Sequence, residues 1–260
     1  MNVAAVPPIG RGQIIRKGQL KYAFAATDSF MAEVLHGEIF EVGTELNIGG
    51  HLITSIEEKL TEKDVTLPFV NPATGPIRVK GAKPGDMIVV KVIDVGVIGV
   101  APVAGGVITI DNGTHGGNLD VQEVCNGSLI AFRAWHEGAY LYFGDVHALQ
   151  GDGEVNGMGA IEIRGHVRCQ VFVLPASPKL NWPRIETATH ICTLGCARPL
   201  DDALRIAFEE MVYWLEASYG FAASEAYMLL GQIAEARCTQ MVNPKYTYIC
   251  KVDKKYLPRR

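Results

Sequence analysis

The stretch KPGDMIVVKVIDV, residues 83–95, places a Pro-Gly turn directly before an apolar run. A run of this kind, bounded by turn residues, is typical of a β-strand. From about Gln13 to Leu174 the same pattern recurs at intervals of roughly ten residues, with clusters of Gly, Pro, Asn and Asp between the runs. The runs are Ile39–Val42, Met87–Val95, Leu129–Ala134, Tyr140–Phe143 and Val167–Leu174. This rhythm predicts a β-sandwich or a β-barrel.

The pattern changes after Pro199, where apolar residues recur at intervals of three and four. They are Leu200, Leu204, Phe208, Met211 and Leu215. This spacing predicts an amphipathic helix. Asp201 and Asp202 favour a helix start at this point, and Gly220 favours its end. A second helix is expected from Ser224, as N-cap, through Ile233.

A strand-like segment, Tyr246–Val252, follows the second helix. We expect the two helices to form an antiparallel hairpin. No linker or internal repeat divides the chain, so we predict one α+β domain that is mainly β and covers residues 1–260. In this division the β-sandwich takes about residues 13–198, and the helical hairpin with the terminal strand takes about residues 199–260.

The composition, with 48% hydrophobic residues in a chain of 260, is that of a globular protein and excludes disorder and collagen-like repeats. The 24 basic and 28 acidic residues give a net charge of -4 without a basic patch, so we expect no nucleic-acid partner. The most apolar stretch, Val95–Ile110, is short for a membrane span and contains Pro102. The start MNVAAVPPIGRG lacks the apolar run of a signal peptide, which predicts a cytoplasmic protein without a membrane partner.

The densest polar segment of the β region is GDVHALQGDGEVNGMGAIE, residues 144–162. On an extended strand, residues two apart point to one face, so Asp145 would lie beside His147, and Asp152 beside Glu154. Carboxylates this close repel one another unless a cation lies between them. The segment therefore favours a divalent metal site over a solvated acidic turn.

A second polar segment, DNGTHGGNLD at residues 111–120, adds His115, Asn118 and Asp120 in a glycine-rich loop. Its glycines would allow the backbone to approach an ion or a substrate closely. A long hairpin loop, in which Asp and Asn bond their own backbone, explains this segment equally well. Histidines together with several aspartates suit a mixed nitrogen and oxygen site for zinc, manganese or iron.

These two motifs, HGGNLD and GDVHALQGDGEV, together with NPATGPIRVKGAKPGDMIVVKVIDV at residues 71–95, resemble the acetamidase/formamidase family. The similarity also includes LDDALRIAF and EAYMLL in the helical part. The resemblance implies a jelly-roll-like β-sandwich with an appended helical part, a divalent metal at the two loops, and assembly into a homo-oligomer. The implied activity is hydrolysis of short linear amides, such as formamide or acetamide, to ammonia and a carboxylate.

The residues that match the family motifs lie in both loops. They are His115, Gly116, Gly117, Asn118 and Asp120 in the first, and Gly144, Asp145, His147, Gln150, Gly151, Asp152, Gly153, Glu154 and Glu162 in the second. Two departures border the expected pocket. Asn156–Gly159 stands where relatives have a Cys-Gly-Thr-like run, and Thr44–Leu46 replaces their Thr-x-Asp. These departures bear on the natural substrate more than on the fold.

An amide resists hydrolysis because its carbonyl is stabilised by resonance and its amine is a poor leaving group. We therefore expect a divalent ion, zinc in the first place and otherwise calcium or another ion. Its expected ligands are His115, Asp120, Asp145, His147 and Asp152. Glu154 is expected as the general base, and Asn118 or Gln150 as the residue that holds the amide.

Three alternatives stay open at this point. A thiol amidase could use Cys125 or Cys169, although both lie beside strand-like runs, where buried inert thiols are common. A β-sandwich binding module could hold a structural calcium in the same acidic loops, but His115 and His147 argue for a softer metal. An amidase homologue that has lost its activity would also fit the two departures.

Overall fold

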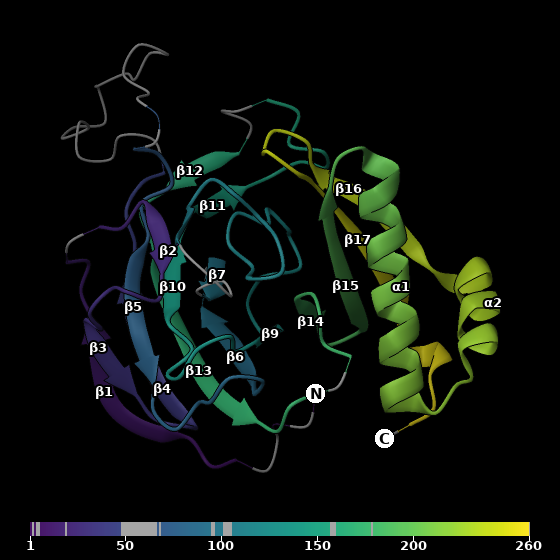
Figure 1. Ribbon diagram of the computed structural model, residues 1–260, viewed down its shortest axis with the longest axis horizontal. Helices are drawn as coiled ribbons and strands as arrows, with labels where there is room; N and C mark the ends of the chain where they lie inside the picture. The colour runs from purple at the N-terminus through teal and green to yellow at the C-terminus, as the bar shows by residue number, and fades with distance from the viewer. Residues whose placement is uncertain are drawn as a thin grey trace.

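The computed structural model describes residues 1–260 except 2, 4–5, 19, 48–66, 68, 95–96, 101–105, 157–159, 178 and 260, and describes 97–100 by their backbone alone. Within the described residues the chain is mainly β and has two α-helices, α1 (Leu200–Tyr219) and α2 (Ala223–Ile233) (Figure 1). Short strands precede and follow them. They are β1 (Ile9–Ile15), β2 (Ala23–Ala25), β3 (Ala32–Val34), β4 (Glu38–Gly43), β5 (Thr74–Val79), β6 (Met87–Asp94), β7 (Val97–Val100), β8 (Gly106–Ile108), β9 (Leu129–Arg133), β10 (Leu141–Gly144), β11 (Val146–Leu149), β12 (Ile161–Ile163), β13 (His166–Leu174), β14 (Arg184–Glu186), β15 (His190–Ala197), β16 (Glu235–Gln240) and β17 (Tyr246–Asp253).

Most strands belong to one nine-stranded sheet in the order β1-β4-β13-β6-β9-β14-β15-β17-β16. A four-stranded sheet in the order β3-β5-β10-β7 and the pairs β11-β12 and β2-β8 complete the described β structure. The strands predicted from apolar runs are confirmed as β4, β6, β9, β10 and β13, with ends that differ by one residue. The turn before β6 is also present, since Gly85 has a φ of 94°.

The main core lies between the two larger sheets. Phe40 of β4 and Phe143 of β10 are both buried, and their ring centroids are 6.0 Å apart in an edge-to-face arrangement. Ile88 and Val90 of β6 and Ile77 of β5 belong to the same buried cluster. Residues that alternate along each strand therefore meet from both sheets, as the sequence pattern predicts.

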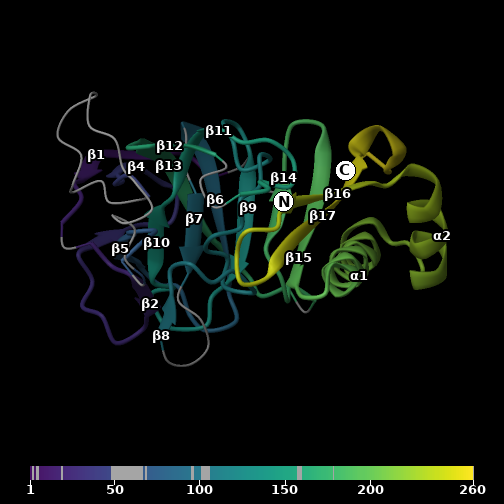
Figure 2. The same ribbon diagram turned by 90° about the horizontal axis from the view of Figure 1, so that it is seen from above.

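The helix predicted after Pro199 is confirmed as α1, and it ends where Gly220 adopts a left-handed φ of 75°. The predicted start of the second helix was wrong by two residues. Ala222, not Ser224, is the N-cap, and its amide donates to the Glu225 carboxylate at 2.9 Å. Figures 1 and 2 show both helices on the side of the molecule formed by β15 and β17.

The strand β16 was not predicted from the sequence, and it pairs with β17 at the edge of the large sheet. The hairpin of β16 and β17 therefore continues the sheet that begins with β1 and β4. The jelly-roll connection pattern, the antiparallel packing of the helices and the division of residues 1–260 into one domain stay predictions. Neither described helix is both long and apolar enough to cross a membrane.

Candidate metal and active site

Five acidic and histidine side chains meet where the loop before β9 approaches the β11-β12 pair. Asp145 precedes β11, and His147 in β11 lies directly opposite Glu162 in β12. Asp120 comes from the loop before β9, and Glu154 from the loop between β11 and β12. Asp120, Asp145 and Glu154 are buried, with 3%, 6% and 7% of their surface exposed. We call these five residues, Asp120, Asp145, His147, Glu154 and Glu162, the carboxylate cluster.

Distances within the carboxylate cluster fit a bound cation. One ligand atom each of Asp120, Asp145 and His147 lies within 4.8 Å of the others, and the same holds for His147, Glu154 and Glu162. His147 belongs to both groups. Its Nε2 atom lies 3.4 Å from Asp145 Oδ1 and 3.3 Å from Glu162 Oε1.

The backbone is strained at the same place. Asp120, Asp145 and Glu154 have φ values of 49°, 57° and 34°, and Asn71 beside them has 53°. Outside this site, the described non-glycine residues with such values are Ala139 and Tyr140. Left-handed backbone in non-glycine residues costs free energy and concentrates at functional sites. It also explains why Asp145 and Glu154 leave the alternation of a regular strand.

Electrostatic repulsion within the carboxylate cluster is strong. Burial and the neighbouring charges of Asp145 and Glu154 raise the pKa of Asp120 well above its usual value. Burial, with repulsion from Asp145 and Glu162, raises the pKa of Glu154 to about 7. Burial opposes the positive charge of His147, but the facing carboxylates of Asp145 and Glu162 outweigh it and raise the pKa of His147 to about 12. The cluster therefore attracts positive charge.

Several buried atoms of the carboxylate cluster lack a hydrogen-bond partner among the described residues. They are Asp120 Oδ1, Asp145 Oδ1, His147 Nε2, Glu154 Oε2 and Glu162 Oε2, of which Asp145 Oδ1 and His147 Nε2 face each other as an ion pair at 3.4 Å. Buried polar atoms in native proteins nearly always have a partner, so unpaired atoms that converge on one point call for an ion or water there. Imidazole nitrogen with carboxylate oxygen is the donor set of zinc, manganese and iron sites.

Two residues predicted as ligands lie outside the carboxylate cluster. The Asp152 side chain is 66% exposed and pairs with Arg237 at 2.8 Å. The expectation that Asp152 and Glu154 share one face was wrong, because residues 150–156 form a turn instead of a strand. His115 is buried next to Phe24 and belongs to neither group of candidate ligands. Burial lowers the pKa of His115 to about 4.

Asn118 and Gln150 lie beside the carboxylate cluster, and hydrogen bonds already hold both side chains. Asn118 donates to the Ile110 carbonyl at 2.8 Å and accepts from the Asn71 amide at 2.6 Å. Gln150 donates to the Asp120 carbonyl at 2.8 Å. Its Oε1 lies 3.2 Å from His147 Nδ1 and can accept the proton of that nitrogen, while Nε2 on the other side of the ring faces the cluster.

Two asparagines that were not predicted as site residues contact the carboxylate cluster. Asn243, in the turn between β16 and β17, donates to Asp120 Oδ2. Asn71 donates to Asp145 Oδ2 at 3.5 Å. Each precedes a proline in the sequence, and an Asn-Pro pair marks a loop position, which was the available signal. Nothing in the sequence near 71 or 243 shows that these loops meet Asp145 and Asp120.

A cleft of about 460 Å³ opens beside Asp120 and His147. Its other lining residues include Val121, Val124, Leu149, Gln150 and Cys125. Burial and the nearby Glu123 charge raise the pKa of the Cys125 thiol, and burial raises that of Cys169 well above its usual value. Neither thiol has the lowered pKa of a reactive cysteine. Residues 156–159 differ from the run expected in relatives, and of these, residues 157–159 lie outside the described part of the chain.

A family model for the acetamidase/formamidase family matches residues 27–104 and 100–180. Both loops of the carboxylate cluster fall in the second range. The chain is 32% identical over 114 residues to a formamidase of Methylophilus methylotrophus, which covers 44% of this chain and 25% of that protein. It is 41% identical over 69 residues to an acetamidase of Mycolicibacterium smegmatis, which covers 26% of this chain and 17% of that protein. The matched segments thus span a quarter or less of these curated relatives.

Solved structures match over nearly the whole chain. The crystal structure of an acetamidase from Yersinia enterocolitica superposes with a TM-score of 0.90 at 26% identity, covering 97% of this chain and 94% of that one. A recombinant predicted acetamidase/formamidase from Thermoanaerobacter tengcongensis gives a TM-score of 0.86 at 27% identity, covering 95% and 97%. Fold, motifs and the match to more than half of the chain agree, and the chain belongs to the acetamidase/formamidase family.

Proposed function

We propose that the protein hydrolyses the C–N bond of short linear amides, of the formamide and acetamide type, to ammonia and a carboxylate, with the help of a divalent ion. The names of the relatives, formamidase and acetamidase, support the reaction. The observation that carries the proposal is the carboxylate cluster, whose buried carboxylate and imidazole atoms converge from three segments of the chain. Such an arrangement costs folding free energy and is kept where it serves a function.

The residues fit a divalent cation. Asp120, Asp145 and His147 are the proposed ligands, because one ligand atom of each lies within 4.8 Å of the others. Asp145 and Glu162 favour the protonated form of His147, and a bound cation would supply the positive charge in its place. We propose zinc first, with calcium or another divalent ion as alternatives, since imidazole suits zinc better than calcium. His115 and Asp152 are not among these proposed ligands, because both lie outside the carboxylate cluster.

When bound, such an ion supplies Lewis-acid polarisation of a carbonyl and activation of water. Glu154 is the proposed general base: it would accept a proton from the attacking water and pass it to the leaving nitrogen. Glu162 is the second candidate for this role, because it contacts His147 from the opposite strand. Asn118 and Gln150 are proposed to orient the amide or the ligands, and Gln150 lines the cleft.

The direct test is ammonia release from a panel of short amides, measured together with elemental analysis of the purified protein. We expect about one tightly held divalent ion per chain, loss of activity after chelation, and recovery when the ion is restored. Unimpaired hydrolysis by metal-free protein would contradict the metal-dependent mechanism. Bound calcium without ammonia release would instead favour a binding module or an inactive homologue.

We also propose that the protein assembles into a homo-oligomer and lies in the cytoplasm. Large apolar side chains are exposed on α2, at Tyr227 and Met228, and in the β11-β12 hairpin, at Leu149, Val155 and Ile161. Exposed apolar groups of this size favour association. Light scattering at micromolar concentration checks the assembly, and a mass near that of one chain, 28.2 kDa, would contradict it.

A further inference from the structure

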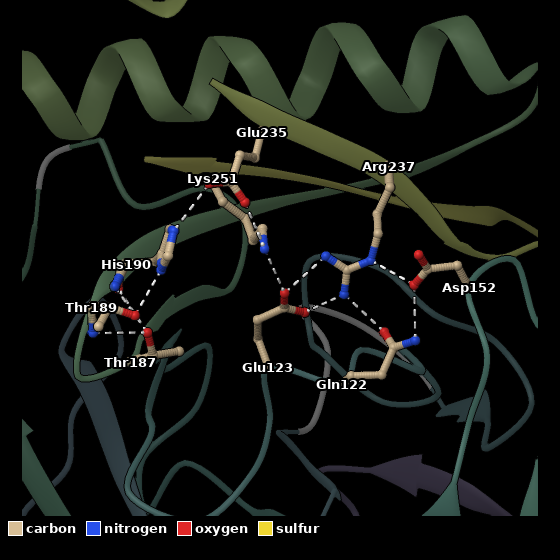
Figure 3. Close-up of polar contacts among 9 residues, drawn as sticks. All are labelled: Gln122, Glu123, Asp152, Thr187, Thr189, His190, Glu235, Arg237 and Lys251. Atoms are coloured by element: carbon tan, nitrogen blue, oxygen red, sulfur yellow. Dashed lines mark hydrogen bonds and ion pairs between the residues drawn. The ribbon is translucent and has the colours of Figure 1, made fainter. Parts of the chain in front are cut away.

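A network of charged side chains joins both loops of the carboxylate cluster to β16 (Figure 3). Arg237 lies at its centre. Its Nη1 and Nη2 atoms donate to the two carboxylate oxygens of Glu123 at 2.9 and 2.8 Å. The Nη2 atom also donates to Gln122 Oε1 at 3.0 Å, and the Nε atom to Asp152 Oδ1 at 2.8 Å.

The partners of Arg237 are close neighbours of cluster residues in the chain. Gln122 and Glu123 follow Asp120 by two and three positions, and Asp152 precedes Glu154 by two. Gln122 closes the ring by donating to Asp152 Oδ1 at 3.1 Å. One guanidinium therefore ties the segment that carries Asp120 to the segment that carries Glu154.

The backbone supports the same connection on one side. Gly153 donates to the Cys238 carbonyl at 3.1 Å, and Met241 donates to the Gly153 carbonyl at 2.9 Å. For the segment around Glu123, no backbone hydrogen bond to β16 is present among the described residues. Side-chain contacts are its link to β16, and Lys251 of β17 adds a second cation 3.3 Å from Glu123.

The carboxylate cluster needs an outside restraint of this kind. Asp120 and Glu154 repel each other and sit on loops with left-handed backbone, so contacts from outside the cluster help to hold them in place. A planar guanidinium with five donors can bind one carboxylate in bidentate fashion and reach a second at the same time, which an ammonium group cannot do. Arg237 and Glu123 are also partly buried, at 23% and 13% exposure, where such pairs are stronger than on an open surface.

We propose that Arg237 is a positioning residue that holds Asp120 and Glu154 at the spacing required for cation binding. This inference rests on the proposed metal-dependent function. It assigns a role in the site to β16, which lies outside the matched range of the family model.

The test compares Arg237→Gln and Arg237→Lys with wild type. Arg78→Gln is the matched control, because Arg78 also pairs with two glutamates, Glu33 and Glu137, neither of which belongs to the carboxylate cluster. The first measurement is hydrogen–deuterium exchange of the metal-free proteins. We expect faster exchange in peptides 118–126 and 148–156 for both Arg237 variants and no change there for Arg78→Gln.

The second measurement is the affinity for Zn²⁺, by competition with a chromophoric chelator. We expect Arg237→Gln to weaken binding about 10- to 100-fold, the usual effect of losing a residue that orients metal ligands. Arg237→Lys keeps the charge but loses the fork, so it should recover little of that affinity. Asp152→Ala, which cuts one arm alone, should speed exchange more in 148–156 than in 118–126.

Unchanged exchange in the two peptides would overturn the proposal, and so would faster exchange with wild-type Zn²⁺ affinity or full rescue by lysine. If Arg237→Gln does not fold, Arg237→Lys and Asp152→Ala carry the same comparison. If wild type neither binds a divalent ion nor releases ammonia, the proposed function fails. The exchange data on metal-free protein then decide by themselves whether Arg237 holds both loops.

Discussion

Asn243 donates a hydrogen bond to the carboxylate of Asp120, a residue 123 positions away in the chain. Both side chains are buried, with 6% and 3% exposure. Asn243 also donates to the Asn118 carbonyl at 3.0 Å. Its amide therefore takes up Oδ2 of Asp120 and leaves Oδ1, which has no described partner, facing the cluster. The β16-β17 turn thus sets the orientation of a proposed metal ligand.

Asn243→Ala should weaken metal binding about 10- to 100-fold while the protein still folds, because Asp120 would lose the donor that orients it. Titration with Zn²⁺ measures the change. Asn181→Ala is the control, since Asn181 donates at 2.9 Å to another buried carboxylate, that of Glu210 in α1. Equal Zn²⁺ affinities in the two variants would show that Asn243 does not orient Asp120.

Glu154→Gln preserves size and hydrogen bonding but removes the proton acceptor. We expect turnover to fall by roughly two to four orders of magnitude, the range for a lost general base, with metal content unchanged. Rates of ammonia release and elemental analysis on the same sample check both parts. Loss of the metal would make Glu154 a ligand and Glu162 the better base, and Glu162→Gln should then show the larger loss of turnover.

Asp145→Asn and Asp152→Asn should differ in metal content. Asp145 contributes a buried oxygen to the carboxylate cluster, whereas the Asp152 side chain is 66% exposed and bound to Arg237. We expect Asp145→Asn to lose the ion on dialysis and Asp152→Asn to keep close to one ion per chain. Retention of the ion by Asp145→Asn, or its loss from Asp152→Asn, would contradict this assignment.

Gly195 of β15 allows α1 to lie against the sheet. A Cβ atom at this position would be 2.2 Å from the Ala203 carbonyl oxygen and 2.9 Å from the Ala207 nitrogen, both in the α1 backbone. We expect Gly195→Ala to lower the free energy of unfolding by about 1–3 kcal/mol or more through overpacking. In α2, a Cβ atom added at Gly231 would meet nothing within 4 Å, so Gly231→Ala should raise stability by up to about 1 kcal/mol. Thermal unfolding of both variants checks the opposite signs.

The ion pairs of Glu123 should contribute stability that depends on pH. Burial opposes its charge, but Arg237 and Lys251 outweigh burial and hold the pKa of Glu123 below its ordinary value of 4.5. A lowered pKa in the folded state adds stability above pH 4.5, and that stability is lost as the pH falls through the folded-state value.

The free energy of unfolding of the wild type should therefore exceed that of Glu123→Gln by about 1.5–3 kcal/mol at pH 7. This is the range for hydrogen bonds to charged groups. The difference should shrink as the pH falls below 4.5, the ordinary value for this carboxyl. Urea unfolding at several pH values measures it. A difference that stays constant down to pH 3 would exclude this linkage.

Local sequence patterns determined much of the fold. The apolar runs between turn residues predicted β4, β6, β9, β10 and β13, because alternation and turn chemistry depend on residues a few positions apart. The spacing from Leu200 to Leu215 and the glycine at 220 predicted α1 and its end for the same reason. The sequence also located the candidate site, since polar residues crowd into 111–120 and 144–162.

The tertiary structure alone decided which of those residues meet. Strand alternation predicted Asp152 beside Glu154. The left-handed backbone at Glu154 and the ion pair of Asp152 with Arg237 direct the two side chains apart. Glu162 joins the cluster through the register of β11 and β12, and Asn243 reaches Asp120 through the pairing of β16 with β17. These contacts join residues up to 123 positions apart, and they depend on how the sheets pack, which no pattern within a short segment of sequence specifies.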